Sequence, residues 1–385
     1  MSGALINQEI LAWAIDRAGI TLEAIAKKAA VKTERLESWL HGDEKPTFRQ
    51  AQTLSSILHI PFGYFFLKEP PEEALSIPDL RTINGDPALR LDTNFRALLS
   101  DVFFKHAWYR DLMIQHGVSE QKYVGKFTLA DSSELIASDI RLQLFGGSDL
   151  PSVTNWEKYL QSLIGLAEEA GIWVMRSSIV GNNTSRPLSV EQFRGFAISD
   201  PIVPLIFING RDAKAAQIFT LAHELAHIWL GESGISNPAL GQKDFGSHKK
   251  LEKKCNEIAA EFLVPKSDLI SNWRENDTLE INIDRLSKRY LVSRIVVARR
   301  AYDLGLLNEE AFKSFYAMER IRWEELKQDS TGGSFHNTLP IRFGRKFTDA
   351  VINQTMSGSL LLKHAGTLLN TRPDTLVNFS RKQAS

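Results

Sequence analysis

The chain has 385 residues, of which 43% are hydrophobic and 24% are charged, and its 46 basic side chains are balanced by 46 acidic ones. This is ordinary globular composition with room for two or three domains, and it argues against a disordered chain or a uniformly basic nucleic-acid-binding one. The single cysteine, Cys255, excludes an internal disulfide framework and fits a reducing compartment. Because the sequence shows neither a signal peptide nor a long apolar run, we expect a cytoplasmic protein without membrane contact.

Residues 1–69 predict an all-α domain. The apolar pattern and the turn residues between its pieces predict five helices, at residues 5–17, 21–29, 33–41, 47–59 and 62–67. Thr21, Thr33 and Thr47 stand where helix N-caps belong. With Trp39-Leu40-His41-Gly42 and Pro46-Thr47 at the turn after the third helix, this five-helix segment resembles XRE-type helix-turn-helix domains, the Cro and repressor-like DNA-binding family.

The XRE resemblance implies an operator DNA as partner, read by the third helix in the major groove. The candidate contacts on this helix are Lys32, Thr33, Arg35 and Ser38. Residues 1–68 carry eight basic and seven acidic side chains, a net charge of only +1. Since phosphate neutralisation supplies much of the affinity for DNA, we expect binding that is weak or that depends on a homodimer. The alternative is a degenerate helix-turn-helix fold that contacts a protein.

The segment after this domain predicts a linker and then a helical connector. Prolines break regular structure and predict an extended linker at residues 70–91. Residues 92–150 follow as a connector, with helices predicted at 92–116 and 131–144. We expect His106 in this connector to have a structural role, because a lone histidine on a helix usually packs or faces solvent.

Residues 151–310 predict an α+β domain with helical extensions. A helix at 155–170 precedes three strand-like runs, which lie at 172–177, 193–199 and 203–209. A further helix begins near Asp212. We expect a site below an edge of this sheet, where a peptide could add itself as a strand. Our candidate for an exposed edge strand is Gly195, Phe196 and Ala197, and the alternative is that this strand is internal.

The helix after Asp212 contains the segment His223-Glu224-Leu225-Ala226-His227. Residues four apart lie on one face of a helix, so His223 and His227 can direct two imidazole nitrogens at one point. This spacing is typical of a zinc site, and Glu224 beside it is placed to accept a proton from an activated water as the catalytic base. The alternative is a pair of buried core histidines with an exposed glutamate.

A second helix, predicted over residues 251–264 and ending before Pro265, offers a third zinc ligand. Glu252 and Asn256 are four residues apart beside its apolar face. Glu252 can therefore complete the coordination while Asn256 orients one of the histidines through a hydrogen bond. Three other residues compete with Glu252 for the ligand role, namely His248, Glu257 and Glu261.

The two helices resemble those of the ImmA/IrrE zinc metallopeptidases over residues 221–230 and 252–265. The resemblance extends over residues 150–270, including Val180-Gly181-Asn182-Asn183 and Arg194-Gly195-Phe196-Ala197. It implies a zincin-like endopeptidase with Zn²⁺ as cofactor, and several members cut a repressor protein in a stress or mobile-element response. Fused to an XRE-like domain, such a peptidase would be a DNA-binding transcriptional regulator. The alternative is an antitoxin and autorepressor of a toxin-antitoxin system, whose peptidase-like domain binds a toxin.

The last part of the chain predicts two further features. Residues 284–307 have the spacing of a second helix-turn-helix pair, decorated with arginines that could touch DNA or form a solvated basic face. Residues 311–385 form a basic C-terminal region of unknown role. From 331 to 385 there are seven basic and two acidic side chains, a net charge of +5, so we expect this region to prefer an acidic partner.

Overall fold

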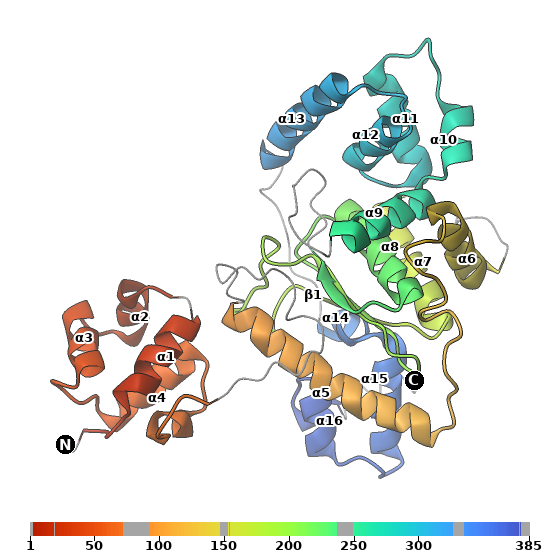
Figure 1. Ribbon diagram of the computed structural model, residues 1–385. Coiled ribbons are helices and arrows are strands. Elements are labelled where there is room, and N and C mark those ends of the chain that lie inside the picture. The colour runs from red at the N-terminus through yellow and green to blue at the C-terminus, as the bar shows by residue number, and fades with distance from the viewer. Residues whose placement is uncertain are drawn as a thin grey trace. The chain divides into compact units, whose positions relative to one another are not determined.

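The computed structural model describes residues 3–18, 20–71, 92–146, 153, 155–236, 249–325, 335–376 and 378 (Figure 1). The chain divides into two compact units. The first unit comprises residues 1–77 with 86–102, and the second comprises residues 78–85 with 103–385. Most of the predicted linker, residues 72–91, lies outside the described residues. Among the helices that the structure describes, none has the length and apolar character needed to cross a bilayer.

The first unit is a bundle of short helices. Its elements are α1 (Gln8–Ala18), α2 (Leu22–Ala29), α3 (Thr33–His41), α4 (Phe48–Leu58) and the 3-10 helix η1 (Phe62–Phe66). These positions match the five helices expected from the sequence within a residue or two at most ends. The core is formed by apolar side chains from all five elements, among them Ile10, Leu11, Ile25, Leu36, Trp39, Leu54 and Phe65.

The ends of these helices show which threonines act as caps. Thr21 accepts a hydrogen bond from the Ala24 amide, and Thr47 forms a reciprocal capping box with Gln50. Thr33 is not a cap, because it is the first residue of α3 and Lys32 holds the N-cap position without a side-chain hydrogen bond. Between α2 and α3 the chain turns at Ala30, whose backbone is left-handed at φ +54°.

The second unit is built around a four-stranded mixed sheet. Its strands are β1 (Trp173–Ser177), β2 (Gly195–Ile198), β3 (Leu205–Asn209) and β4 (Gly234–Ser236), in the order β1-β3-β2-β4. β1 is parallel to β3, while β2 is antiparallel to both β3 and β4. The expectation that Gly195–Ala197 forms an edge was therefore wrong. β2 is internal, and β4, which the sequence did not predict, closes that side of the sheet.

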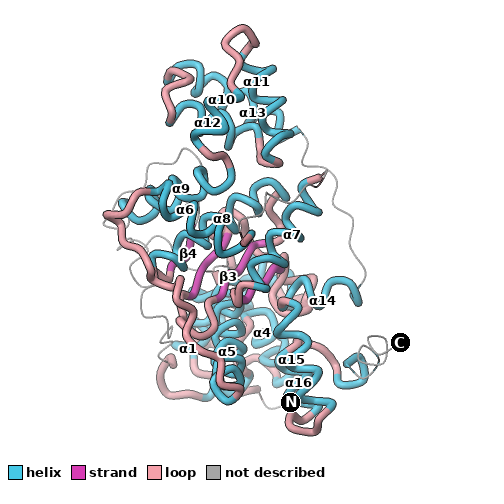
Figure 2. The backbone as a smooth tube through the Cα atoms, turned by 90° about the vertical axis from the view of Figure 1, so that its right-hand side faces the viewer, coloured by secondary structure: helices cyan, strands magenta, loops and turns pink. Residues whose placement is uncertain are grey.

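Helices cover both faces of the sheet (Figure 2). α8 (Lys214–Leu230) packs on β2 and β3, and α9 (Lys249–Leu263) packs along α8. α6 (Ser133–Phe145) and α7 (Trp156–Glu169) complete this layer. Every residue of β3 is buried, which explains its continuous apolar sequence. The core on the α8 side includes Val174, Ile206, Ile208, Leu221, Leu225, Ile258 and Phe262.

Four helices follow α9. They are α10 (Lys266–Asn272), α11 (Leu279–Tyr290), α12 (Arg294–Asp303) and α13 (Glu309–Glu325). The arginines of α12 are engaged in ion pairs: Arg294 lies 3.0 Å from both Asp284 and Glu319, and Arg300 pairs with Glu261. α13 begins at Glu309 and packs on α12, so the boundary drawn at residue 310 falls inside this helix.

The C-terminal helices dock on β1. α14 (Phe335–Phe343), α15 (Arg345–Met356) and α16 (Leu362–Leu368) were not expected from the sequence. The Trp173 indole donates a hydrogen bond of 2.6 Å to the Phe343 carbonyl and stacks on Phe347 at 4.4 Å. Gly344, at φ +81°, is required here, because a Cβ would lie 2.7 Å from the Trp173 ring. α5 (Thr93–Gln115) adds Tyr109 to this aromatic cluster, 5.2 Å from Trp173.

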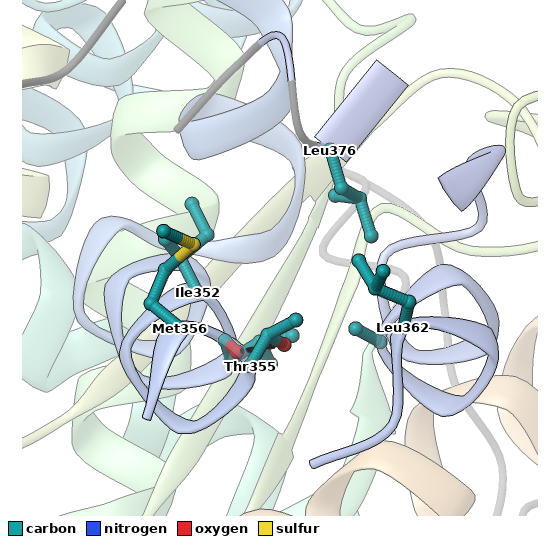
Figure 3. Close-up of a pocket in the computed structure, with 7 residues that line it drawn as sticks. Ile352, Thr355, Met356, Leu362 and Leu376 are labelled. Carbon is teal, nitrogen blue, oxygen red and sulfur yellow. Dashed lines mark hydrogen bonds between the residues drawn. The ribbon is translucent and has the colours of Figure 1, made fainter. Parts of the chain in front are cut away.

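The C-terminal helices also enclose a small apolar pocket (Figure 3). Ile352, Thr355 and Met356 of α15 face Leu362 of α16 and Leu376 across it. Its space of about 260 Å³ includes volume that is open to solvent. The pocket is remote in sequence from the histidine motif.

Candidate metal and catalytic site

The paired histidines lie on the buried central part of α8. From Gln217 to Leu230 every residue of this helix is buried, and the helix ends at Gly231, whose φ of +72° fits a left-handed C-cap. His223 and His227 are fully buried, and their Nε2 atoms lie 3.2 Å apart. Burial lowers the pKa of His227, which favours the neutral imidazole that a metal ligand requires.

Glu252, in the first turn of α9, brings a carboxylate to the same point. Its Oε2 lies 3.2 Å from His223 Nε2, and its Oε1 lies 3.4 Å from His227 Nε2. Burial opposes ionisation of this carboxyl, but hydrogen bonds with the two histidines outweigh it and hold the pKa of Glu252 well below its usual range. Two imidazoles and an ionised carboxylate therefore converge, which is a donor set that fits a divalent zinc ion.

His223 is oriented by a partner on its other side. Asn256 Oδ1 lies 3.0 Å from His223 Nδ1, and an amide oxygen can only accept, so His223 donates from Nδ1 and leaves Nε2 free for a metal. The sequence indicated Asn256. The backbone of Glu232, which follows the end of α8, raises the pKa of His227 and so opposes part of the effect of burial. The sequence did not indicate this effect of Glu232, because a backbone group has no residue-type signal.

Glu224 lies beneath β2, where glycine makes room for it. The Glu224 side chain is fully buried. A Cβ at Gly195 would lie 2.9 Å from Glu224 Oε1 and 2.5 Å from Thr220 Cγ2. On the neighbouring strand, a Cβ at Gly234 would lie 3.5 Å from His227 Cε1. Gly195 on β2 thus lets the sheet approach the face of α8 that carries the motif, while a Cβ at Gly234 would make only ordinary contact.

Cys255 offers a second possible donor to the histidine pair. Ligand atoms of His223, His227 and Cys255 lie within 4.8 Å of one another. Burial raises the pKa of the Cys255 thiol and favours its neutral form, and the side chain belongs to the apolar core. The oxygens of Glu252 lie close to both histidine nitrogens and are charged, so the carboxylate is the better third ligand on geometry and charge.

The rival carboxylates contact other partners. Glu257 accepts a hydrogen bond of 3.2 Å from Ser133 and lies 3.8 Å from Lys253. Glu261 pairs with Arg300 and accepts from the Lys266 amide at 3.2 Å. Neither is brought to the histidines. His248 lies outside the described residues.

The candidate DNA contacts of the first unit cluster at the start of α3. Lys32 is exposed, and the Arg35 side chain is 51% exposed while lying 3.3 Å from Glu44. The Arg35 guanidinium also lies over the Trp39 ring. Ser38 is half-buried and donates to the Glu34 carbonyl at 3.0 Å, and Thr33 is also half-buried. Lys32 and Arg35 are therefore the more accessible of the four.

Comparison with known families agrees with the second unit's geometry. Residues 167–302 match the family model described as the IrrE N-terminal-like domain, so this segment is similar to metallopeptidases of the ImmA/IrrE type. The match runs from the end of α7 to α12 and includes the histidine pair, Glu224, Glu252 and Asn256. Residues 343–382 match a domain of unknown function, DUF8813, which takes in α15 and α16. A comparison with curated proteins finds no match.

Proposed function

We propose that the second unit is a zinc-dependent endopeptidase. His223, His227 and Glu252 would hold the ion and Glu224 would be the catalytic base. The observation that carries this proposal is the convergence of three donor groups from two helices within 3.4 Å, on a segment similar to a family of metallopeptidases. When bound, zinc supplies a Lewis acid that acidifies water and polarises a carbonyl group.

The chain's own residues would do the rest of the chemistry. Glu224 would hold a proton at its carboxylate and deliver it to the leaving amine. Asn256 would keep the His223 imidazole in the tautomer that leaves Nε2 free. Among the strands that the structure describes, β4 is the outer one beside His227, so an extended peptide could pair with it by backbone hydrogen bonds. The substrate class that this geometry favours is an unfolded segment of a protein.

The test of the peptidase is Glu224→Gln. We expect this variant to keep its zinc and to lose cleavage by a factor of at least about 100, because an amide cannot accept the proton. Cleavage of a mixture of unstructured peptides is measured by mass spectrometry, and zinc by elemental analysis. Glu257→Gln is the matched control, because the Glu257 carboxylate contacts Ser133 rather than the histidines. Cleavage by Glu224→Gln at the wild-type rate would refute the role of Glu224.

We also propose that the first unit binds DNA through α3. Support comes from the short turn that joins α2 to α3 at Ala30 and from the exposure of Lys32 and Arg35 at the start of α3. A DNA-binding unit fused to a peptidase would direct cleavage toward a repressor or another regulator. Binding of a protein that is not cut would instead favour the antitoxin function.

The DNA proposal is tested with the double variant Lys32→Ala/Arg35→Ala. We expect weaker binding to duplex DNA, and a shallower dependence of log affinity on log salt, by about one unit for each phosphate that the variant no longer neutralises. Fluorescence anisotropy over a range of salt concentrations measures both quantities. Lys158→Ala, an exposed basic residue on α7 of the second unit, is the control. An unchanged affinity and slope would show that α3 does not face DNA.

A further inference from the structure

The pocket between α15, α16 and Leu376 is a recess in the surface of the C-terminal helices (Figure 3). Of the seven described residues that line it, six are apolar. Val351 and Ala365 are buried at its base, whereas at its rim Leu362 is 43% exposed and Met356 is 69% exposed. Exposed apolar side chains that gather around a recess are typical of a surface that binds another molecule. We call this pocket the apolar groove.

Backbone hydrogen bonds hold the two walls of the apolar groove. In the turn after α15, the Leu360 amide donates to the Gln354 carbonyl at 2.9 Å, and after α16 the Thr371 amide donates to the Gly366 carbonyl at 2.9 Å. A Cβ at Gly366 would lie 2.8 Å from the Thr371 carbonyl oxygen, so this turn packs closely on α16. A recess with fixed walls loses little entropy when a partner enters, while the flexible side chain of Met356 can adjust to its shape.

Two cations lie next to the apolar groove in the chain. Lys363 directly follows Leu362, and Arg372 is one turn before Leu376, whose amide donates to the Arg372 carbonyl at 3.3 Å. Both side chains are exposed, and neither forms an ion pair with a residue that the structure describes. The exposed acid Asp374 offsets one of the two charges. The surroundings of the groove therefore keep a positive charge that is open to a partner.

We propose that the apolar groove docks an acidic, apolar segment of another protein. Residues 335–376 carry five basic and two acidic side chains, a net charge of +3, and residues 377–385 add two basic side chains and no acidic one. A second copy of this region, or the chain's own C-terminal end, would bring more positive charge to surroundings that are already positive. An acidic segment brings the opposite charge, and apolar side chains at helical spacing can enter a groove between two helices.

The docking proposal goes beyond the proposed peptidase and DNA binding and does not depend on them. The groove lies within residues 351–376, inside the segment that matches a domain of unknown function, and it includes none of the proposed zinc ligands. The net charge of residues 331–385 led us to expect an acidic partner, and the groove is our proposal for its contact point. A docked protein would be held on the same unit as the proposed zinc site.

Fluorescence anisotropy of labelled peptides with the full chain tests the docking. The probes are two synthetic helical peptides with leucines at positions i, i+3, i+4 and i+7, one with glutamates and the other with lysines at the remaining positions. We expect the glutamate peptide to bind at least about tenfold more tightly, and added salt to weaken it. Met356→Glu should weaken this binding at least about tenfold, because it places an acid in the groove, and Lys363→Glu should weaken it severalfold.

Each variant has a matched control. Met318 on α13 is 54% exposed, so Met318→Glu makes the same change outside the groove, and Lys158→Glu on α7 matches Lys363→Glu. Circular dichroism checks folding, and Met356→Ser is the milder substitution. The measurement is repeated with a chelator, which should leave the affinity unchanged because the groove holds no proposed zinc ligand. Failure of the docking is thus distinguishable from failure of the peptidase, which Glu224→Gln tests separately.

Three results would overturn the proposal. The first is a wild-type chain that does not bind the glutamate peptide, which is also what a groove covered by another part of the same chain would give. The second is binding that does not distinguish the two peptides, or that Met356→Glu leaves unchanged. The third is no peptide binding together with attachment to phosphatidylserine vesicles, or a dimer, that Met356→Glu abolishes; either would assign the groove to a membrane or to a second copy.

Discussion

Glu252 shares α9 with three other residues that bear on the proposed zinc site. Asn256 is one turn further along and contacts His223, and Cys255 beside it is buried in the core. Glu257 faces Ser133 of α6. Because successive helical positions are rotated by about 100°, the proposed ligand, the orienting amide, the core thiol and the surface carboxylate point in different directions. At this scale the identity of one residue and its angle on the helix decide its role.

Three substitutions on α9 are expected to affect zinc affinity to different degrees, from a large loss to no change. Asn256→Ala removes the partner of His223 and should weaken zinc binding by about 10- to 100-fold. Glu252→Ala removes a proposed ligand and should cost more than that. Glu257→Ala should have no effect, because its carboxylate is turned toward Ser133. Competition with a chromophoric chelator measures the affinities without any activity assay. Equal affinity of Glu252→Ala and wild type would reject Glu252 as a ligand.

The sequence was informative about residues wherever spacing on one helix defined the geometry. His223 and His227 are four residues apart, and so are Glu252 and Asn256. In the structure the two histidines lie side by side, and Glu252 and Asn256 both contact His223. Their roles stay predictions. Spacing could not place Cys255 near the histidines, because that proximity depends on how α9 is turned against α8.

At the scale of elements, α8 and the sheet are in unusually close contact at one glycine. Gly195 on β2 takes the place of a side chain that would meet Thr220 and Glu224. Strand order could not be read from the sequence, because local pattern does not encode which strands are neighbours. β4 has three residues, too few for an alternating pattern to be recognised. These are the reasons why the internal strand β2 was taken for the edge.

Gly195→Ala tests the close approach of the sheet. Its methyl group would lie 2.5 Å from Thr220 Cγ2 and 2.9 Å from the Phe207 carbonyl oxygen, so we expect a loss of roughly 1–3 kcal/mol in the free energy of unfolding. Adding Thr220→Ser should restore part of this loss but not all, since the Phe207 carbonyl belongs to the backbone. Urea denaturation measures each variant. Gly165→Ala on α7, where a Cβ meets nothing within 4 Å, is the control. A neutral Gly195→Ala would refute the steric argument.

At the scale of the whole molecule, a buried acid joins the C-terminal helices to α7 within the second unit. Glu168 at the end of α7 accepts a hydrogen bond of 2.9 Å from the Arg345 amide, beside the contact between Trp173 and Phe343. Burial raises the pKa of Glu168 to about 7, against the opposing effect of the Arg345 amide and of nearby cations. The folded chain therefore keeps Glu168 protonated up to a higher pH than an ordinary carboxyl group.

This shift predicts how stability depends on pH. A carboxyl whose folded pKa lies above its unfolded value stabilises the fold at acid pH, and that contribution is lost as the pH rises from 4.5 through 7. The loss is at most about 3.5 kcal/mol, because the pKa shifts from 4.5 to about 7 and each pKa unit is worth about 1.4 kcal/mol. We therefore expect unfolding free energy to fall between about pH 5 and about pH 8 in the wild type, and to fall less in Glu168→Gln.

Urea denaturation at several pH values measures this dependence. Glu169→Gln, the exposed neighbour of Glu168, should behave like the wild type. An identical pH dependence in Glu168→Gln and wild type would exclude Glu168 as its source. Nothing in the sequence indicated this attachment beyond the positive charge of the C-terminal region, because the contacts join residues 170 positions apart in the chain.

The contact between Trp173 and the C-terminal helices limits how this chain can be shortened for laboratory work. Removal of the residues from Phe335 onward would take away the Phe347 ring and the Phe343 carbonyl that the Trp173 indole contacts. It would also remove the helices that cover β1. Uncovered strands pair with other chains, so we expect a second unit without these helices to precipitate under conditions where the full chain stays in solution. A fragment made for expression should therefore contain both β1 and the C-terminal helices that pack on it.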